Sequence, residues 1–457
     1  MGQDGKILVF WWTLSEKPPV IDSIYVAKKQ KHYSVQRRTF SATRSLLRFF
    51  SSEKPPRTEK TPRPGIKIAF IHNEKRIHTG MHTGAAQINR LMAAALAEKS
   101  VLVKNFYPRY QLTDTPAHLK GIANILFFYS MLEHKDQMLK YDIIQGTTYT
   151  PLPFLAFNTP VVCHFGSTVR GYLESVPATK KLPTSERAVF KELEKLKIIP
   201  QLDFDTFRPM EDIADIEALA ASRASKCIAT SEKVKDELME MGITAERISV
   251  IHNAIESYWF DPPRVAKIGE PHLVFLGRLG NDVFTLKLKG FSRLVHFYRA
   301  FPNSPKTTIC MTTNRKLKDW LRVAFPKHYM FVNLRKDLIP GALAPLCGSI
   351  LFLSSRYEGF SLSLVEGMSQ GLVPITFPVG VAPEIIKDGE NGFIVNSTEE
   401  AITRAKELLR NEELRLSMSA KAKDTAQRFK SERIAGDLLS LYREIKNKGQ
   451  KQEKAEA

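Results

Sequence analysis

The feature that most constrains the fold is a strand, a short loop and a helix that follow one another and carry two glutamates eight positions apart. Ser349–Leu353 is an apolar run typical of a buried strand, and residues 362–370 have helical spacing and stop at a glycine. Glu358 falls in the loop and Glu366 in the helix. Open α/β sheets bind ligands at the carboxyl ends of their strands. The sequence therefore predicts an α/β fold with a ligand site at this loop.

The chemistry of these residues suits a sugar. A carboxylate such as Glu358 or Glu366 can accept hydrogen bonds from two vicinal hydroxyls. The backbone N–H groups of Gly359, Phe360 and Ser361 lie near the start of the predicted helix, which favours an anionic or hydroxyl-rich ligand. The spacing alone also fits an exposed helix glutamate and an N-terminal charge favoured by the helix dipole. The surrounding motifs are therefore needed to distinguish a sugar-binding site from a pair of ordinary helix glutamates.

Those motifs extend the pattern downstream. The two glutamates are followed by Met-Ser-Gln-Gly at 368–371 and by Gly-Val-Ala-Pro-Glu-Ile-Ile-Lys-Asp-Gly-Glu-Asn-Gly-Phe at 380–393. In this order the segment resembles the donor-binding half of retaining GT-B glycosyltransferases with an E-x7-E signature, the glycosyltransferase family 4 type or "glycosyl transferases group 1". The resemblance is dense over 270–445 and looser over 66–262. It implies two Rossmann-like domains that face one another across a cleft, with a C-terminal helix that crosses back to the first domain.

Length and composition add a domain prediction, because 457 residues exceed what one core accommodates. Residues 1–64, rich in Lys, Arg, Ser and Pro, are expected to form a basic, disordered extension. The resemblance implies an N-terminal Rossmann-like acceptor-side domain at 65–262 and a C-terminal Rossmann-like nucleotide-sugar-binding domain at 263–430. A crossover helix and polar tail follow at 431–457, and the interdomain linker is predicted at 256–269.

The formal net charge of +19 predicts affinity for an anionic partner, which is phospholipid, nucleic acid or a phosphorylated substrate. Between Phe40 and Phe50 the apolar residues share one half of a helical wheel and Arg44 and Arg48 the other. This pattern fits a basic helix on an anionic bilayer, part of a transit peptide, or a disordered tail.

The four cysteines are scattered, which favours a reducing compartment. We expect a cytoplasmic protein without a nucleic-acid partner, with peripheral contact to the inner face of the membrane as an open alternative.

The first domain contributes two candidate site residues. Lys67–Ile71 is a predicted strand that leads through a glycine-containing loop into a predicted helix at 85–97. The resemblance places Gly84 at the second of two glycines near the donor phosphates, although Thr83 occupies the position of the first. His164 directly follows a buried strand. The family often carries a histidine here, near the acceptor and the transferred sugar, whereas a lone histidine can also be structural.

The second domain opens with His272–Leu279, a predicted strand with Arg278 near its end. The resemblance implies that this arginine and a lysine bind the donor's diphosphate. Lys289 matches the lysine, but the interval of eleven positions is longer than usual. We therefore expect a loop insertion at 281–288 and keep Lys287 as a competing candidate. Fixed positive charge is needed here because negative charge grows on the departing diphosphate.

We predict no metal site. His78 and His82 have the i, i+4 spacing of a helical zinc pair, but neighbouring glycines disfavour a helix. Asp203 and Asp205 form a D-x-D that does not follow a suitable strand. No cofactor is expected beyond the nucleotide-diphospho-sugar that serves as donor substrate.

The resemblance implies a retaining, metal-independent hexosyltransferase that acts on a polysaccharide, glycolipid or other glycan. The expected catalytic residues are Glu358, His164, Arg278 and Lys289. The expected donor-binding residues are Gly84, Arg278, Lys287, Lys289, Glu358, Gly359, Phe360, Ser361 and Glu366. Alternatives are a non-catalytic protein that binds nucleotide-sugar or polyanion, and another GT-B activity such as an epimerase or a phosphorylase. The sugar, the nucleotide base and the acceptor stay open.

Overall fold

The computed structural model describes residues 65–73, 84–99, 101–110, 122–199, 207–263, 265–266, 269–280 and 282–456. All of them belong to one compact unit, Pro62–Ala457. Several features discussed above lie outside the described residues: the basic extension at 1–64 with its amphipathic segment, Thr83, His78, His82, Asp203 and Asp205.

The first sheet has six strands, paired in parallel in the order β2-β1-β3-β4-β5-β6. Its strands are β1 (Lys67–Ile71), β2 (Leu102–Phe106), β3 (Ile143–Thr147), β4 (Val161–Phe165), β5 (Lys226–Ala229) and β6 (Ile248–Val250). The helices around it are α1 (Gly84–Ala97), α2 (Ala123–Leu132), α3 (Lys135–Met138), α4 (Val169–Ser175), α6 (Phe207–Arg223) and α7 (Glu232–Glu240).

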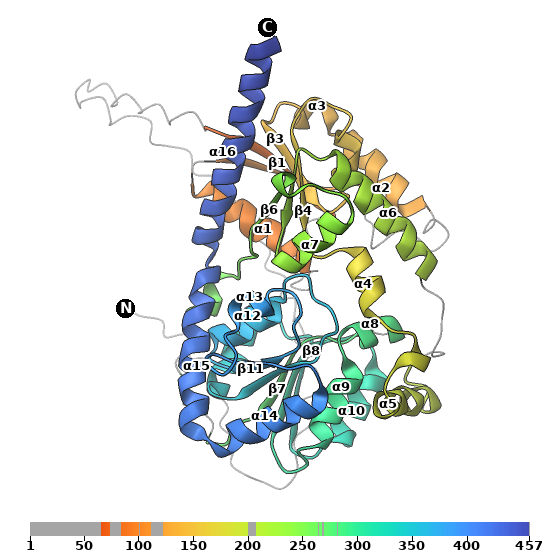
Figure 1. Ribbon diagram of the computed structural model, residues 1–457, viewed down its shortest axis with the longest axis vertical. Helices are drawn as coiled ribbons and strands as arrows, with labels where there is room; N and C mark the ends of the chain where they lie inside the picture. Colours follow the sequence, from red (N-terminus) through yellow and green to blue (C-terminus); the bar gives the residue numbers. More distant parts are fainter. Residues whose placement is uncertain are drawn as a thin grey trace, which may run out of the picture. The chain divides into compact units, whose positions relative to one another are not determined.

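Apolar side chains on both faces of the strands explain why this sheet is covered on two sides. Successive side chains of a strand point to opposite faces. On β1, Ile68 and Phe70 pack in the cluster that contains α1 and the last helix, α16 (Ser431–Glu456). Ala69 and Ile71 pack in the cluster that contains residues of α2 and α6. Figure 1 shows these two helix layers on either side of the strands.

The second sheet also has six strands paired in parallel, in the order β12-β11-β10-β7-β8-β9. Its strands are β7 (Leu273–Arg278), β8 (Lys306–Met311), β9 (His328–Val332), β10 (Ile350–Leu353), β11 (Val373–Thr376) and β12 (Phe393–Ile394). The helices around it are α8 (Val283–Leu288), α9 (Phe291–Arg299), α10 (Arg315–Ala324), α11 (Ile339–Leu343), α12 (Leu362–Ser369), α13 (Ala382–Ile385), α14 (Thr398–Arg410) and α15 (Glu412–Ala426).

Two parallel sheets with flanking helices confirm the predicted α/β GT-B architecture. In the second sheet β7 lies between β8 and β10, so the order of the strands reverses there. Arg278 ends β7, and the loop with Glu358 follows β10. Both therefore reach the carboxyl edge at the switch point, where ligands bind in such sheets.

The C-terminal helix returns to the first sheet, as predicted. Ile434, Leu438 and Tyr442 of α16 are buried against β1 and α1, and the Tyr442 hydroxyl donates a hydrogen bond to Gln145 Oε1 on β3 (2.6 Å). In Figure 1, α15 lies beside the second sheet and α16 continues along the first.

The predicted loop insertion at 281–288 is wrong, because most of it forms α8. Asp282 is the N-cap of this helix, and its carboxylate accepts a hydrogen bond from the backbone N–H of Thr285 (2.7 Å). Aspartate is among the preferred N-cap residues. The cap residue Asp282, which indicates the start of a helix, could have been recognised in the sequence. Ser231 likewise caps α7, where its side chain accepts a hydrogen bond from the backbone N–H of Val234 (3.2 Å).

Helix α5 (Thr184–Lys195) lies between β4 and β5 in the sequence, yet it packs against α9 beside the second sheet. Phe190 and Leu193 are fully buried in the same cluster as Phe291. The Glu186 carboxylate pairs with Arg356 and accepts a hydrogen bond from Ser292 Oγ (2.6 Å). Figure 1 shows α5 next to α9 and α10. The chain therefore joins the two sheets here as well as at the linker.

Glu186→Gln is expected to destabilise the protein by about 1–3 kcal/mol, because it leaves Arg356, whose side chain is only 11% exposed, without its charged partner. Chemical denaturation followed by circular dichroism measures this change. Glu174→Gln, at an exposed position on α4, is the matched control and should leave the unfolding curve unchanged. Equal curves for both variants would contradict the role assigned to Glu186.

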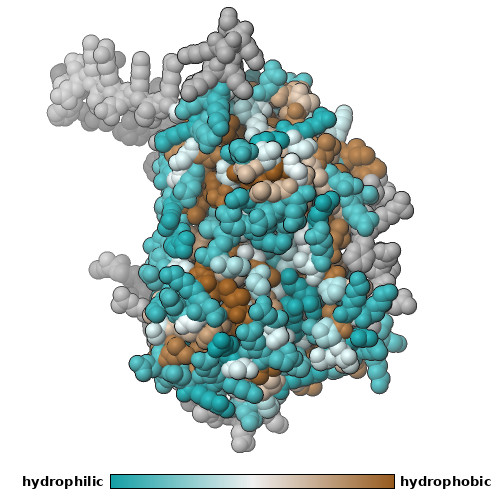
Figure 2. Space-filling model, viewed as in Figure 1, coloured by the Kyte–Doolittle hydropathy of each residue, from teal (hydrophilic) through white to brown (hydrophobic). Residues whose placement is uncertain are grey.

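Two properties of the structure bear on whether the protein contacts a membrane or another apolar partner. No helix within the described ranges is long and apolar enough to span a membrane. On α2, however, Ile125 and Tyr129 are 63% and 68% exposed. Figure 2 shows hydrophobic side chains at the surface in the region that α2 occupies in Figure 1.

Candidate functional site

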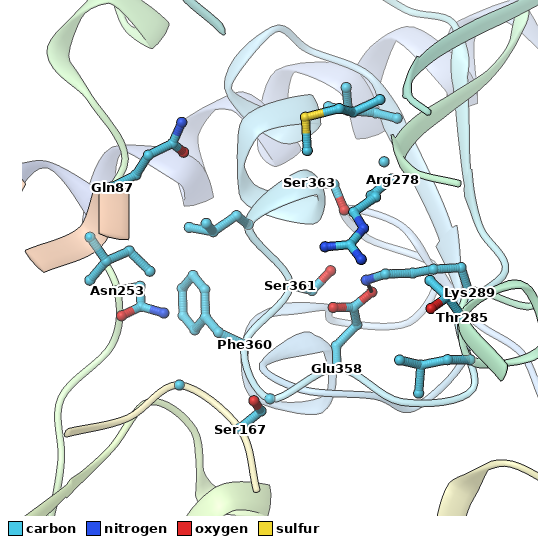
Figure 3. A pocket seen from close by; sticks show the side chains of 18 of the residues that line it. Gln87, Ser167, Asn253, Arg278, Thr285, Lys289, Glu358, Phe360, Ser361 and Ser363 are labelled. Carbon is cyan, nitrogen blue, oxygen red and sulfur yellow. Dashed lines mark hydrogen bonds and ion pairs between the residues drawn. The ribbon is translucent and has the colours of Figure 1, made fainter. Parts of the chain in front are cut away.

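A cavity of about 790 Å³ lies between the carboxyl edges of the two sheets. Thr147, the last residue of β3, and His164, the next-to-last residue of β4, line it from the first sheet. Arg278, Glu358 and Glu366 line it from the second sheet. Residues predicted from separate motifs are thus brought to one cavity, part of which is drawn in Figure 3.

Lys289 and Glu358 form an ion pair in this cavity. The Lys289 Nζ lies 2.6 Å from Glu358 Oε1, and the Ser355 hydroxyl donates to the same oxygen (2.7 Å). Figure 3 shows the Arg278 guanidinium on the same side of the cavity, close to this pair. Two cations and one carboxylate therefore face the same space.

A tight turn places Lys289. The next residue, Gly290, has a left-handed backbone (φ 60°), and a Cβ there would lie 1.7 Å from the Ser354 carbonyl oxygen. Ser354 Oγ also donates to the Lys289 carbonyl (2.8 Å). Glycine is required because no side chain fits between the two backbones. Lys287, the competing candidate, is buried in α8 and does not line the cavity.

Glu366 is buried on α12 and has a cation beside it. Its Oε1 lies 3.0 Å from the ammonium of Lys336, which donates a hydrogen bond to Glu256 Oε1 (3.0 Å). Burial raises the pKa of Glu366, and Lys336 opposes this shift. Burial alone would lower the pKa of Lys336, but Glu366 and Glu256 together raise it. Sequence reasoning missed Lys336 and Glu256, and no motif marks either of them.

His164 is buried at the end of β4. Burial lowers the pKa of its imidazole to about 4, so the ring is neutral at pH 7. Its Nδ1 makes no hydrogen bond within the described part of the chain. The ring can therefore donate or accept a hydrogen bond towards a ligand but does not supply a positive charge. Gly84, the other first-domain candidate, begins α1, whose Gln87 and Ile88 line the cavity.

The first-sheet side also holds an amide that the sequence analysis missed. Asn253 is buried and lines the cavity, and its Oδ1 has no hydrogen-bond partner among the residues that the structure covers. Gln87 lines the same side, and Figure 3 shows both amides there. Asn253 stands three residues after the end of β6, at the carboxyl edge of the first sheet, which is the signal that would have found it.

The loop that carries Glu358 is also held by the first sheet. The Tyr357 hydroxyl donates to Glu237 Oε2 on α7 (2.8 Å) and accepts from the backbone N–H of Thr168 (3.1 Å). The Thr168 hydroxyl donates to the same Glu237 oxygen (2.6 Å). Nearby, Glu217 accepts from the backbone N–H of Val169 (2.8 Å), and burial raises its pKa to about 8. A carboxyl with that pKa is protonated at pH 7.

The same loop makes a close backbone contact across the cavity. A Cβ on Gly359 would lie 2.0 Å from the Gly166 carbonyl oxygen, and Ser231 Oγ donates to the Gly359 carbonyl (2.6 Å). Phe360 and Ser361 follow and line the cavity, and the buried Ser361 hydroxyl has no hydrogen-bond partner in the described ranges. The position of Glu358 thus depends on residues of both sheets.

The described residues contain no group of three His, Cys, Asp or Glu side chains arranged to hold a metal ion. What they do place together around one cavity is three cations (Arg278, Lys289 and Lys336), three carboxylates (Asp282, Glu358 and Glu366), a neutral imidazole and two amides. This arrangement suits a ligand with both anionic and hydroxyl groups.

Solved structures share this fold. Sucrose-phosphate synthase from Thermosynechococcus elongatus superposes with a TM-score of 0.61 at 15% identity, over 83% of this chain and 99% of the other. HepE from Anabaena, in complex with UDP-glucose, superposes with a TM-score of 0.55 at 17% identity, over 82% of this chain and 99% of the other.

Sequence relatives match over shorter stretches. The N-acetyl-alpha-D-glucosaminyl L-malate synthase of Bacillus anthracis is 32% identical over 99 residues, which are 21% of this chain and 26% of the relative. The curated relatives that match are covered over 19% to 55% of their own length.

Two family models match separate stretches of the chain. The model described as "Glycosyltransferase Family 4" matches residues 92–257, which form most of the first sheet and its helices. The model described as "Glycosyl transferases group 1" matches residues 341–425, which include the loop and helix with Glu358 and Glu366. The chain therefore belongs to the group 1 glycosyltransferases of the GT-B fold.

Proposed function

We propose that this protein is a retaining glycosyltransferase that moves a sugar from a nucleotide-diphospho-sugar to a hydroxyl acceptor without a divalent metal. The observation that carries the proposal is the meeting of Arg278, Lys289, Glu358 and Glu366 in one cavity between the two sheets. Arginine offers a planar fork to phosphate oxygens and lysine a mobile point charge. The bound UDP-glucose of HepE, which has the same fold, supports a nucleotide sugar as donor.

In the proposed reaction the bond between the anomeric carbon and the diphosphate oxygen breaks, and a bond from that carbon to the acceptor oxygen forms on the same face. The acceptor's proton passes to the departing phosphate oxygen. Arg278 and Lys289 stabilise the charge that grows on the diphosphate. Glu358 accepts hydrogen bonds from sugar hydroxyls, and Glu366 accepts them from the ribose. His164, neutral at pH 7, contributes a hydrogen bond rather than a charge.

The acceptor is proposed to be a glycan or a glycolipid. The amides of Gln87 and Asn253 face the cavity from the first-sheet side and suit hydroxyl groups. The exposed Ile125 and Tyr129 on α2 supply an apolar surface in the same domain, which favours a lipid-linked acceptor and peripheral contact with a membrane.

Donor binding can be tested by thermal unfolding in EDTA with UDP-glucose, UDP-galactose, UDP-N-acetylglucosamine, GDP-mannose and the free nucleotides. We expect one donor and its nucleoside diphosphate to raise the midpoint, since a ligand at 100 times its Kd stabilises by about 2.7 kcal/mol. Arg278→Ala should abolish the rise. Arg322→Ala, at an exposed position on α10 that does not line the cavity, is the matched control and should retain it.

The same sample then distinguishes the activities. Transfer to an added glycan or glycolipid, with the product's anomeric configuration read by NMR, is the expected result. A stabilising donor that is never consumed would identify a binding protein. A donor returned with an inverted ring carbon would identify an epimerase, and sugar phosphate formed from a glycan would identify a phosphorylase. No shift with any nucleotide would overturn the proposed donor class.

A further inference from the structure

Lys336 occupies an unusual position for a lysine. It is the first residue of the short helix η6 (Lys336–Leu338), which follows β9, and its side chain is only 17% exposed. It lines the cavity together with Leu334 and Ile339, on the second-sheet side. Lysine is rarely buried without a partner. Its role therefore depends on the groups that hold it.

Two carboxylates hold the Lys336 ammonium. It donates a hydrogen bond to Glu256 Oε1 (3.0 Å) and lies 3.0 Å from Glu366 Oε1. Glu256 is itself fixed, because its Oε2 accepts a hydrogen bond from the indole N–H of the fully buried Trp259 (3.2 Å). The indole thus fixes Glu256, Glu256 fixes the ammonium, and the ammonium fixes one oxygen of Glu366.

The ammonium also favours the charged form of Glu366. The Glu366 side chain is 8% exposed, and burial raises the pKa of its carboxyl. Of the groups that act on it, Lys336 lowers that pKa and Glu256 raises it. Burial, Glu256 and Glu366 in turn raise the pKa of the Tyr258 hydroxyl. Without Lys336, burial and Glu256 would both favour the protonated form. A protonated carboxyl is a weaker acceptor for a pair of hydroxyls.

We propose that Lys336 is a positioning residue for the donor's ribose, which keeps the Glu366 carboxylate charged and oriented to accept hydrogen bonds from the two ribose hydroxyls. The inference rests on the proposed function, since it assigns a nucleotide to this cavity. It adds a residue that does not itself touch the reacting atoms, together with Glu256 as its anchor in the linker.

The test compares UDP with 2′-deoxyUDP, by calorimetric titration of the wild type and of Lys336→Met at pH 6.5 and 8.5. The wild type should bind UDP about tenfold more tightly than 2′-deoxyUDP at both pH values, which is the effect of one hydrogen bond to a charged group. Lys336→Met should lose this preference at pH 6.5 while still binding 2′-deoxyUDP, whose remaining 3′-hydroxyl loses the same charged acceptor. Any part of the loss that is due to protonation of Glu366 should shrink at pH 8.5, because a rising pH favours the ionised form of a carboxyl whose pKa burial raises.

Two further variants keep the test decisive. Lys336→Gln retains a hydrogen-bond donor without the charge and should lose the preference in the same way. Lys336→Arg retains the charge and should preserve it. Binding of 2′-deoxyUDP shows that a variant is folded, so that a larger loss of affinity for UDP than for 2′-deoxyUDP reports on the 2′-hydroxyl. GDP and 2′-deoxyGDP replace these probes if the wild type binds GDP instead.

The outcomes separate the two proposals. A wild type that binds neither UDP nor GDP would overturn the proposed function. A wild type that binds UDP and 2′-deoxyUDP equally, or a Lys336→Met and Lys336→Gln pair that keeps the wild-type preference at both pH values, would overturn the role of Lys336 while donor binding stands.

Discussion

Lys289→Ala is expected to lower the turnover number for sugar transfer by about 10²–10³-fold, the effect of removing one group that stabilises developing negative charge. The lysine is held at the cavity by the Gly290 turn, and its ammonium lies beside Glu358 and on the side where Arg278 points. Stability should change little, because Glu358 keeps the Ser355 hydroxyl as a donor. Turnover and KM with the donor identified by the thermal screen measure the effect.

The control is Lys423→Ala, which removes an exposed lysine of α15 that does not line the cavity. It should behave as the wild type. If Lys289→Ala kept its turnover within about threefold, electrostatic stabilisation of the diphosphate by this residue would be excluded, since such a loss is far below the effect of one charge-stabilising group.

A double-mutant cycle separates two ways in which Lys289 could act. If it stabilises the diphosphate directly, Lys289→Ala should reduce turnover further in a Glu358→Ala background. If it only orients Glu358 through their 2.6 Å ion pair, the double variant should match Glu358→Ala. We expect the first result, because Figure 3 shows the ammonium and the Arg278 guanidinium on the same side of the cavity.

The parts of the fold that were predicted are those that local pattern determines. The apolar runs at β7 and β10 and the helical spacing of α12 gave those elements to within one or two residues. Arg278 and Glu358 could be placed together because parallel strands deliver their carboxyl ends to one edge. The retained configuration, the absence of a metal requirement and the individual site roles stay predictions.

The parts that were missed depend on contacts between distant residues. Nothing local to α5 shows that Phe190 packs beside the second sheet, because an amphipathic helix has the same pattern whichever core it joins. Lys336 and Glu256 meet across 80 positions of the chain. In the sequence Lys336 stands between an arginine and an aspartate, as an exposed lysine would. The cap at Asp282 is different, because it was a local signal that the resemblance led us to overlook.

Gly359→Ala is expected to lower kcat/KM by at least about 10²-fold, the cost of a displacement of about 1 Å at a catalytic group. The added Cβ would lie 2.0 Å from the Gly166 carbonyl oxygen and 2.6 Å from Ser167 Cα. Both are backbone atoms, so no side chain can turn away to make room. The loop with Glu358 must then move away from the first sheet. Gly359 does not have a left-handed backbone, so the alanine itself introduces no local strain.

Gly242→Ala is the control for Gly359→Ala, because it should change stability and leave activity unchanged. This glycine has a left-handed backbone (φ 86°) and open space around it. An alanine there should cost about 1–2 kcal/mol of stability through backbone strain and leave transfer unchanged. Unfolding curves and kcat/KM, measured on both variants, therefore separate stability from function. If Gly359→Ala retained full activity, the approach of the two loops could not be part of the active arrangement, and the contacts of Tyr357 and Ser231 with the opposite sheet would have to be structural only.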